Sequence, residues 1–166
     1  MRTVIGVMGG GYADSATERN AAELGSLIAS RGWVLLNGGR DAGVMAASAR
    51  GARQAGGLTV GVLPDGDTLR LSPDIDIAIL TGLGDARNVV NVLSSHVVIA
   101  LRGQAGTLSE VAHALKAGRP VIALDFPLGP VFEPYRAQGL LHEADSPAAA
   151  VELAAGLLGE QNMRDE

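Results

Sequence analysis

The chain has 166 residues, of which 47% are hydrophobic and 3% aromatic, and it contains no cysteine. This length and apolar content suit one domain with a substantial core, and the absence of cysteine excludes disulfides and thiolate sites. The net charge of -5 and the scarcity of aromatic side chains argue against a nucleic-acid surface, which is typically basic and rich in stacking platforms.

The first residues form a short apolar run that breaks into glycines at Gly9. A signal peptide needs a longer apolar region and a small-residue cleavage site, and a membrane-spanning helix needs roughly 18 to 20 apolar residues. The sequence meets neither requirement. We therefore expect a cytoplasmic protein with no membrane partner, and we interpret the first run as a strand.

Short apolar runs alternate with segments of helical spacing along the chain. Because most runs are continuously apolar, they are typical of strands covered by helices on both faces. This alternation predicts an α/β fold with a doubly wound, Rossmann-like, largely parallel sheet of about six or seven strands flanked by helices. The predicted strands are Thr3–Met8, Trp33–Asn37, Leu58–Leu63, Ile75–Leu80, His96–Leu101 and Pro120–Leu124. The predicted helices are roughly Ala16–Ser30, Gly43–Ala55, Ala86–Ser94, Leu108–Ala117 and Pro147–Leu158.

Several residues carry signals for helix ends. Ser15–Glu18 and Thr107–Glu110 have the spacing of a capping box, in which a hydroxyl and a carboxylate satisfy backbone donors reciprocally. Ser146 suits an N-cap, and Gly32 and Gly118 suit the ends of helices.

The chain shows no internal repeat, linker or low-complexity block that would mark a second domain. We expect a single nucleotide-binding α/β domain over residues 1–159. The polar residues 160–166 are expected to form a frayed tail.

Three predicted strands end in glycine-rich turns, at Gly9–Gly11, Gly38–Gly43 and Arg102–Thr107. In a doubly wound sheet, ligands bind outside the carboxyl ends of the strands, near the point where strand order reverses. Glycine lets the backbone approach an oxyanion closely, and the following helix N-terminus supplies amide donors. The three turns therefore predict a site for a phosphate or carboxylate group, although neither the full dinucleotide fingerprint nor a P-loop is present.

Each of these signals also has a purely structural interpretation. Gly39 and Gly43 could form only a tight strand-to-helix turn, and Glu110 could be no more than the third residue of a capping box. Arg87 could be a solvated surface charge, although its place near a helix start is unfavourable to the helix dipole. The three histidines form no cluster, so we expect no metal site.

Three motifs together resemble those of a known family. They are Asn-Gly-Gly-Arg-Asp-Ala-Gly-Val-Met at 37–45, Asp-Ala-Arg ending at Arg87, and Gly103-x-x-Gly106-Thr107-x-x-Glu110, of which the last is the most specific. With these motifs the chain resembles the LONELY GUY family and its relatives, a group also labelled "possible lysine decarboxylases" that includes the molybdenum cofactor carrier proteins. The resemblance spans nearly the whole chain. The short chain and the Asn-Gly-Gly-Arg-Asp run are most similar to the branch that contains the carriers.

For the phosphoribohydrolase members, the resemblance implies cleavage of the N-glycosidic bond of a nucleoside 5'-monophosphate. The family's catalytic arginine and glutamate match Arg87 and Glu110 here. The carboxylate would stabilise an oxocarbenium-like transition state or orient water, and the guanidinium would bind the departing base or the phosphate. The resemblance and the glycine turns assign ligand and phosphate binding to Gly10, Gly11, Gly38, Gly39, Arg40, Gly43, Val44, Met45, Gly103, Gln104, Ala105, Gly106 and Thr107.

The sequence departs from the phosphoribohydrolase pattern at two positions of one motif. Arg102 stands where the family usually has proline, and Gln104 stands where it has its second glycine. The residues before Arg87 also differ, and these changes put cytokinin-precursor specificity in doubt. The decarboxylase label fails on composition, because a pyridoxal enzyme needs a Schiff-base lysine and the only lysine, Lys116, suits a solvated helix end.

Two functions follow as hypotheses. The leading one is a nucleotide-binding hydrolase of the phosphoribohydrolase type, and the alternative is a non-catalytic carrier of a nucleotide or of the molybdenum cofactor. A regulatory nucleotide sensor is a third, weaker reading. No cofactor is required for the chemistry, and the bound small phosphorylated ligand would be an AMP-like nucleotide or the molybdenum cofactor. The resemblance also implies a homodimer or a homotetramer.

Overall fold

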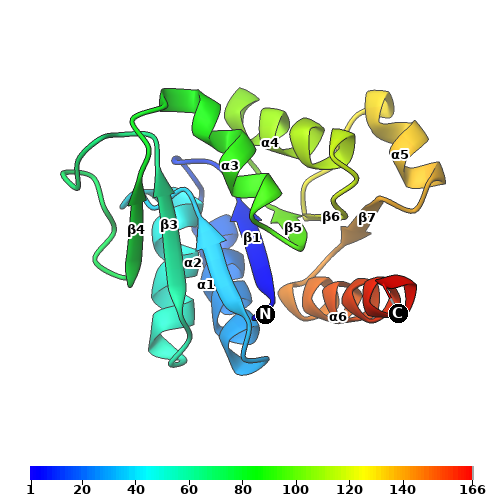
Figure 1. Ribbon diagram of the computed structural model, residues 1–166, viewed down its shortest axis with the longest axis horizontal. Coiled ribbons are helices and arrows are strands. Elements are labelled where there is room, and N and C mark those ends of the chain that lie inside the picture. The colour runs from blue at the N-terminus through cyan, green and yellow to red at the C-terminus, as the bar shows by residue number, and fades with distance from the viewer. Residues whose placement is uncertain (166) are drawn as a thin grey trace.

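The computed structural model describes residues 1–165, without the side chains of residues 161, 162, 164 and 165. Seven strands form one sheet in the order β4-β3-β2-β1-β5-β6-β7, and every pair of neighbours is parallel (Figure 1). This confirms the predicted doubly wound fold. The strands are β1 (Val4–Met8), β2 (Val34–Asn37), β3 (Thr59–Leu63), β4 (Ile77–Leu80), β5 (Val97–Ala100), β6 (Val121–Leu124) and β7 (Leu141–Ala144).

The helices lie in two layers, one on each face of the sheet (Figure 1). One layer contains α1 (Ser15–Ser30), α2 (Gly43–Gln54) and α6 (Pro147–Asp165). The other contains α3 (Arg87–Leu93), α4 (Ala105–Lys116) and α5 (Glu133–Ala137). Two 3-10 helices, η1 (Gly84–Ala86) and η2 (Pro130–Phe132), lead into α3 and α5.

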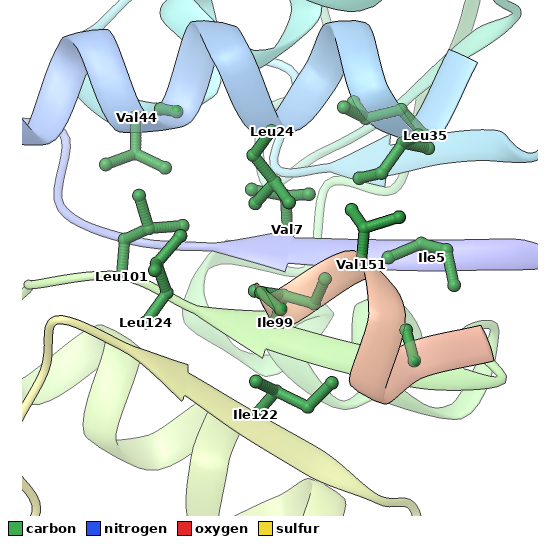
Figure 2. Close-up of a cluster of buried hydrophobic side chains, with 14 of the residues drawn as sticks. Ile5, Val7, Leu24, Leu35, Val44, Ile99, Leu101, Ile122, Leu124 and Val151 are labelled. Atoms are coloured by element: carbon green, nitrogen blue, oxygen red, sulfur yellow. The ribbon is translucent and has the colours of Figure 1, made fainter. Parts of the chain in front are cut away.

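The central strands are buried between these layers, which explains their continuous apolar sequence. Figure 2 shows the core on the α1, α2 and α6 side, where Val7 and Ile99 of the sheet belong to one cluster with Leu24 of α1 and Val151 of α6. Val7, Ile99 and Leu24 are 0% exposed. Each fully buried side chain of this kind contributes about 1.5–3 kcal/mol to folding.

The two edges of the sheet differ from the sequence-based expectation. The whole of β4 is exposed, with Ile77 and Ile79 47% and 43% exposed, so this strand is an exception to the coverage on both faces that was expected for most strands. The reason is that β4 is an edge strand whose one neighbour is β3, and η1 and α3 follow it past its carboxyl end. At the other edge, β7 has the mixed sequence Leu-His-Glu-Ala and therefore lacked the apolar signal used to locate strands. Exposed apolar edges favour association, and the homodimer or homotetramer stays a prediction.

The two predicted capping boxes are wrong. Asp14, not Ser15, caps α1, and its carboxylate accepts a hydrogen bond from the Thr17 amide. The N-cap of α4 is Gln104, which places Thr107 inside the first turn. Glu110 is therefore not the third residue of a capping box, and the structural reading of this side chain is overturned.

Other predicted helix ends are confirmed. Gly32 and Gly118 follow α1 and α4 with φ of 70° and 71°, a backbone conformation that favours glycine. Ser146 precedes α6 and accepts a hydrogen bond from the Ala149 amide. Helix α6 itself runs to Asp165 instead of ending at Leu158, so it extends into the segment 160–166 that we expected to fray, and Glu166 lies outside the described residues.

Membrane crossing is a separate question from the fold. Along residues 1–165, none of the helices combines the length and the apolar composition that a crossing of the bilayer requires.

Helices α1 and α2 pack with their backbones in close contact. A Cβ added to Gly25 would overlap the carbonyl oxygen of Ser48, and one added to Gly51 would overlap that of Ala22. Glycine at these two positions therefore sets the distance between the helices, which in turn positions the loops that precede them.

We expect Gly51→Ala to destabilise the fold by about 1–3 kcal/mol, because the extra methyl forces the two helix backbones apart. Gly156 in α6 is the matched control, since an added Cβ there has no atom within 4 Å. Gly156→Ala should stabilise the protein by about 0.5–1 kcal/mol through helix propensity alone. Urea denaturation measures both values, and equal effects at the two positions would contradict this account of the packing.

Candidate functional site

The three predicted glycine turns meet at one place above the sheet. The strand order reverses between β1 and β5, and the loops after these strands lie side by side, with the Gly10 amide donating to the Arg102 carbonyl at 3.1 Å. The loop after β2 joins them, because the Val44 amide donates to the Gly10 carbonyl at 3.0 Å. The turns therefore build one crevice at the switch point, where doubly wound sheets bind ligands.

A pocket of about 250 Å³ lies in this crevice. It brings together residues from four separate stretches of the chain. The predicted site residues that line it are Gly10, Gly11, Gly38, Met45, Arg87, Gln104, Gly106, Thr107 and Glu110. The pocket lining also includes Tyr12, Asp85 and Asn88, to which the sequence assigned no ligand role. Asp85 belongs to the recognised Asp-Ala-Arg motif, and Tyr12 and Asn88 each follow a recognised motif directly.

Three predicted ligand residues of the β2–α2 turn do not line the pocket but shape its wall. Gly39 and Gly43 have φ of 74° and 48°, so both form the tight strand-to-helix turn of the structural interpretation. Val44 is fully buried in the core beneath the β1 loop. A ligand role for these three residues stays a prediction.

Arg40 also lies outside the pocket lining. Its guanidinium binds the Asp65 carboxylate, with Nε to Oδ2 at 3.2 Å and Nη2 to Oδ1 at 3.0 Å. This pair ties the β2–α2 turn to the segment after β3, and a direct contact of Arg40 with a ligand stays a prediction.

The phosphate-loop motif forms the N-terminus of α4. Gln104 caps this helix without any side-chain hydrogen bond, whereas Asp14 caps α1 with its carboxylate. The first amides of α4, at Ala105, Gly106 and Thr107, therefore receive no acceptor from the N-cap side chain, and Gly106 and Thr107 line the pocket. Gly103 makes the loop compact, because an added Cβ would overlap the Thr107 hydroxyl.

Arg87 begins α3 and points its guanidinium into the pocket wall. The side chain is buried, and its Nε has no hydrogen-bond partner within the described part of the chain. Its ion pair with Glu110 joins Nη1 and Oε1 at 3.6 Å, which is longer than a hydrogen bond. Burial lowers the pKa of Arg87, with Glu110 opposing this effect. The structural reading of Arg87 as a solvated surface charge is therefore wrong.

Gly38 makes room for this guanidinium. A Cβ at position 38 would lie 2.7 Å from Nη2 of Arg87 and 2.7 Å from the sulfur of Met45. The Asn-Gly-Gly motif after β2 thus serves the pocket by letting Arg87 lie against bare backbone.

Glu110 faces Arg87 from α4 and is also buried, at 6% exposed. Its pKa is raised from 4.5 to about 7, chiefly by burial. The hydrogen bond from Asn91 and the charge of Arg87 oppose this rise without cancelling it. Asn91 Nδ2 donates to Glu110 Oε1 at 2.9 Å. Sequence reasoning missed Asn91, although it lies four residues after Arg87 and so shares its face of α3.

The site offers two kinds of chemistry. Arg87 and the amides at the start of α4 can donate hydrogen bonds to an anion, and residues of both groups line one pocket. Glu110 is a carboxyl group that exchanges its proton near neutral pH, as a general acid or base requires. Among residues 1–165 with described side chains, no group of three or more His, Cys, Asp or Glu side chains is placed to hold a metal ion.

Comparison with protein families and solved structures gives three informative matches. The family model of the SLOG cluster4 family matches residues 2–151. The molybdenum cofactor binding protein of Rippkaea orientalis superposes with a TM-score of 0.87 at 47% identity, covering 95% of this chain and 98% of that one. The molybdenum cofactor carrier protein of Chlamydomonas reinhardtii superposes with a TM-score of 0.85 at 44% identity, covering 96% and 99%.

Similarity to a phosphoribohydrolase is more distant. The cytokinin riboside 5'-monophosphate phosphoribohydrolase of Mycobacterium tuberculosis is 37% identical over 113 residues, which are 63% of this chain and 60% of that enzyme. The resemblance inferred from the motifs is thereby confirmed, and so is the greater similarity to the branch of the carriers.

The raised pKa of Glu110 predicts a pH dependence of stability. Between pH 4.5 and about 7 the folded protein holds a proton that the unfolded chain has released. The stabilisation is therefore complete below pH 4.5 and is lost as the pH rises through about 7. Relative to Glu110→Gln, the wild-type free energy of unfolding should fall by up to about 3 kcal/mol between about pH 4.5 and 8. Denaturant titrations across this range test it, and a constant difference between the two proteins would contradict it.

Proposed function

Because the chain belongs to the SLOG cluster4 family, we propose that its pocket binds a small phosphorylated ligand and that this ligand is the molybdenum cofactor. Two solved structures that are similar over nearly the whole chain are named for binding or carrying that cofactor. The cofactor would be cargo held by the chain, with its phosphate at the α4 N-terminus.

The observation that carries this proposal is the state of Arg87. Arg87 is buried, and its Nε has no hydrogen-bond partner within the described residues. It lines one pocket together with the N-terminus of α4, where the N-cap residue makes no side-chain hydrogen bond. Burying an arginine without acceptors costs free energy, because its N–H groups lose their water. A ligand phosphate would supply acceptors to Arg87 and to the helix amides together.

The binding proposal predicts a selective effect of Gly106→Asp. An added Cβ at Gly106 has no atom within 4 Å, so the fold should accept the side chain. The carboxylate favours the helix N-terminus by about 0.3–1 kcal/mol but repels a phosphate at the same amides. We expect at least about a tenfold loss of affinity, a difference of about 1.4 kcal/mol.

The measurement is an anaerobic titration with extracted molybdenum cofactor, followed by its absorbance. Gly156→Asp, at an equally open position in α6, is the control and should bind like the wild type. Equal affinities for Gly106→Asp and the wild type would place the phosphate elsewhere. Absence of binding to the wild type would overturn the proposed ligand.

A second candidate function is hydrolysis of a nucleoside 5'-monophosphate. The pairing of Arg87 with Glu110 favours it, together with the partial similarity to the mycobacterial enzyme. In this reaction the N-glycosidic bond breaks, water adds to the anomeric carbon, and the base leaves with a proton. Glu110 would orient the water or stabilise the oxocarbenium-like transition state, and Arg87 would bind the leaving base or the phosphate.

Glu110→Gln separates the two functions. If the chain is a hydrolase, purified protein releases free base from at least one of a panel of nucleoside monophosphates, and Glu110→Gln lowers kcat by about 100-fold or more with retained binding. If it is a carrier, no base appears and Glu110→Gln leaves ligand binding intact. Chromatography of the products and a binding titration on the same samples provide both readouts.

A further inference from the structure

Asn91 and Arg87 both approach the same oxygen of Glu110. Asn91 Nδ2 forms a hydrogen bond to Oε1 at 2.9 Å, and Arg87 Nη1 lies 3.6 Å from that same atom. The neutral amide therefore holds the hydrogen-bonding position, while the guanidinium stays at ion-pair distance.

Asn91 is firmly placed for this contact. It is 0% exposed, and its backbone carbonyl accepts a hydrogen bond from the Ser95 hydroxyl at 2.8 Å. It lies one helical turn after Arg87, so both side chains leave the same face of α3 toward α4. A second amide, Asn88 Nδ2, bonds the Ser109 hydroxyl at 3.1 Å and holds the two helices together beside it.

The Asn91 amide is not optimised for stability. Its Oδ1 is buried without a hydrogen-bond partner in the described part of the chain. A buried acceptor without a partner lowers stability, and an apolar side chain of the same size would avoid this cost. An unsatisfied buried amide in contact with the pocket residue Glu110 calls for an explanation.

Arg87 has the means to close the gap to Glu110 if the amide were absent. The remaining distance to a normal charge-assisted hydrogen bond of about 2.8 Å is less than one ångström. Gly38 lies against the guanidinium, where an added Cβ would come within 2.7 Å of Nη2 and 2.8 Å of Nη1. A closed pair would use donors of Arg87 that otherwise face the ligand.

We propose that Asn91 is a positioning residue: by holding Glu110 Oε1, it keeps the carboxyl group and Arg87 apart and leaves the guanidinium open to the anionic group of the ligand. This inference rests on the proposed function in that it assigns the ligand's anion to Arg87. It adds the residue that keeps the pair from collapsing.

Few charges act on this pair. Arg87 is the charged group that affects Glu110, while Arg40, Asp85 and Asp65 affect Arg87 from the β2–α2 turn, η1 and the segment after β3. On α4 itself, His113 and Lys116 lie in the last turn, at the end away from the pocket. A change in the titration of Glu110 after substitution of Asn91 therefore reports on Asn91 and Arg87.

The first test measures the pKa of Glu110 by carbon NMR of its carboxyl group, identified by the signal lost in Glu110→Gln. Asn91→Leu removes the amide but keeps the volume. If Arg87 closes onto Glu110, the measured pKa of Glu110 is lower in Asn91→Leu than in the wild type, because a closer positive charge favours the carboxylate. If Asn91 only donates a hydrogen bond to the carboxylate, its removal raises the pKa, because that bond lowers it now.

The second test measures the affinity for molybdenum cofactor by titration. Asn91→Leu should weaken binding about tenfold or more, because the closed pair occupies donors of Arg87. In the Glu110→Gln background no ion pair can form, so Asn91→Leu should change the affinity by less than about threefold. Equal losses in both backgrounds would overturn the proposal and leave Asn91 a purely structural residue.

Controls keep the two proposals distinguishable. Ser109→Ala removes the neighbouring bond between α3 and α4 and should leave the pKa of Glu110 unchanged. Asn91→Ala serves as the second variant if circular dichroism shows that Asn91→Leu is not folded. The NMR titration needs no ligand, so a wild-type protein that fails to bind the cofactor would overturn the proposed function while the sign of the pKa change still decides the role of Asn91.

Discussion

The buried pair of Arg87 and Glu110 is the constraint on which the site depends. Two opposite charges lie between α3 and α4, and desolvation is the largest influence on the pKa of each. Attraction at 3.6 Å does not offset this loss of hydration. Around the pair, the Asn91 amide donates to the carboxyl group, Gly38 places bare backbone beside the guanidinium, and both charged side chains line one pocket.

The fold brings these parts together through the order of its strands. Strands β1 and β5 are neighbours at the point where the strand order reverses, so the loops that follow them lie side by side. A backbone hydrogen bond between Gly10 and Arg102 joins these loops. The loop after β2 joins the same crevice, because the Val44 amide donates a hydrogen bond to the Gly10 carbonyl. An uncapped helix and an arginine from distant parts of the chain thus face one volume.

Binding and hydrolysis make different demands on this arrangement. A carrier needs anion donors that are already in place and needs little from Glu110 beyond its effect on Arg87. A hydrolase needs the carboxyl group itself near the anomeric carbon, with a pKa suited to proton transfer. Glu110 has a pKa that suits the second demand and a position beside Arg87 that suits the first. The same pocket is therefore consistent with similarity both to a molybdenum cofactor binding protein and to a phosphoribohydrolase.

The amino-acid sequence by itself was sufficient for the fold class and for the place at the sheet edge where the three glycine turns meet. Continuous apolar runs and glycine turns are local signals, and parallel strands carry their turns to a common edge. Only the tertiary structure decided the states of Arg87, Glu110 and Asn91, because burial and distance between α3 and α4 are properties of packing. The wrong capping boxes and the exposure of β4 have the same cause. The spacing of residues in a sequence cannot show that α4 begins right after Gln104, or that an apolar strand lies uncovered at the edge of the sheet.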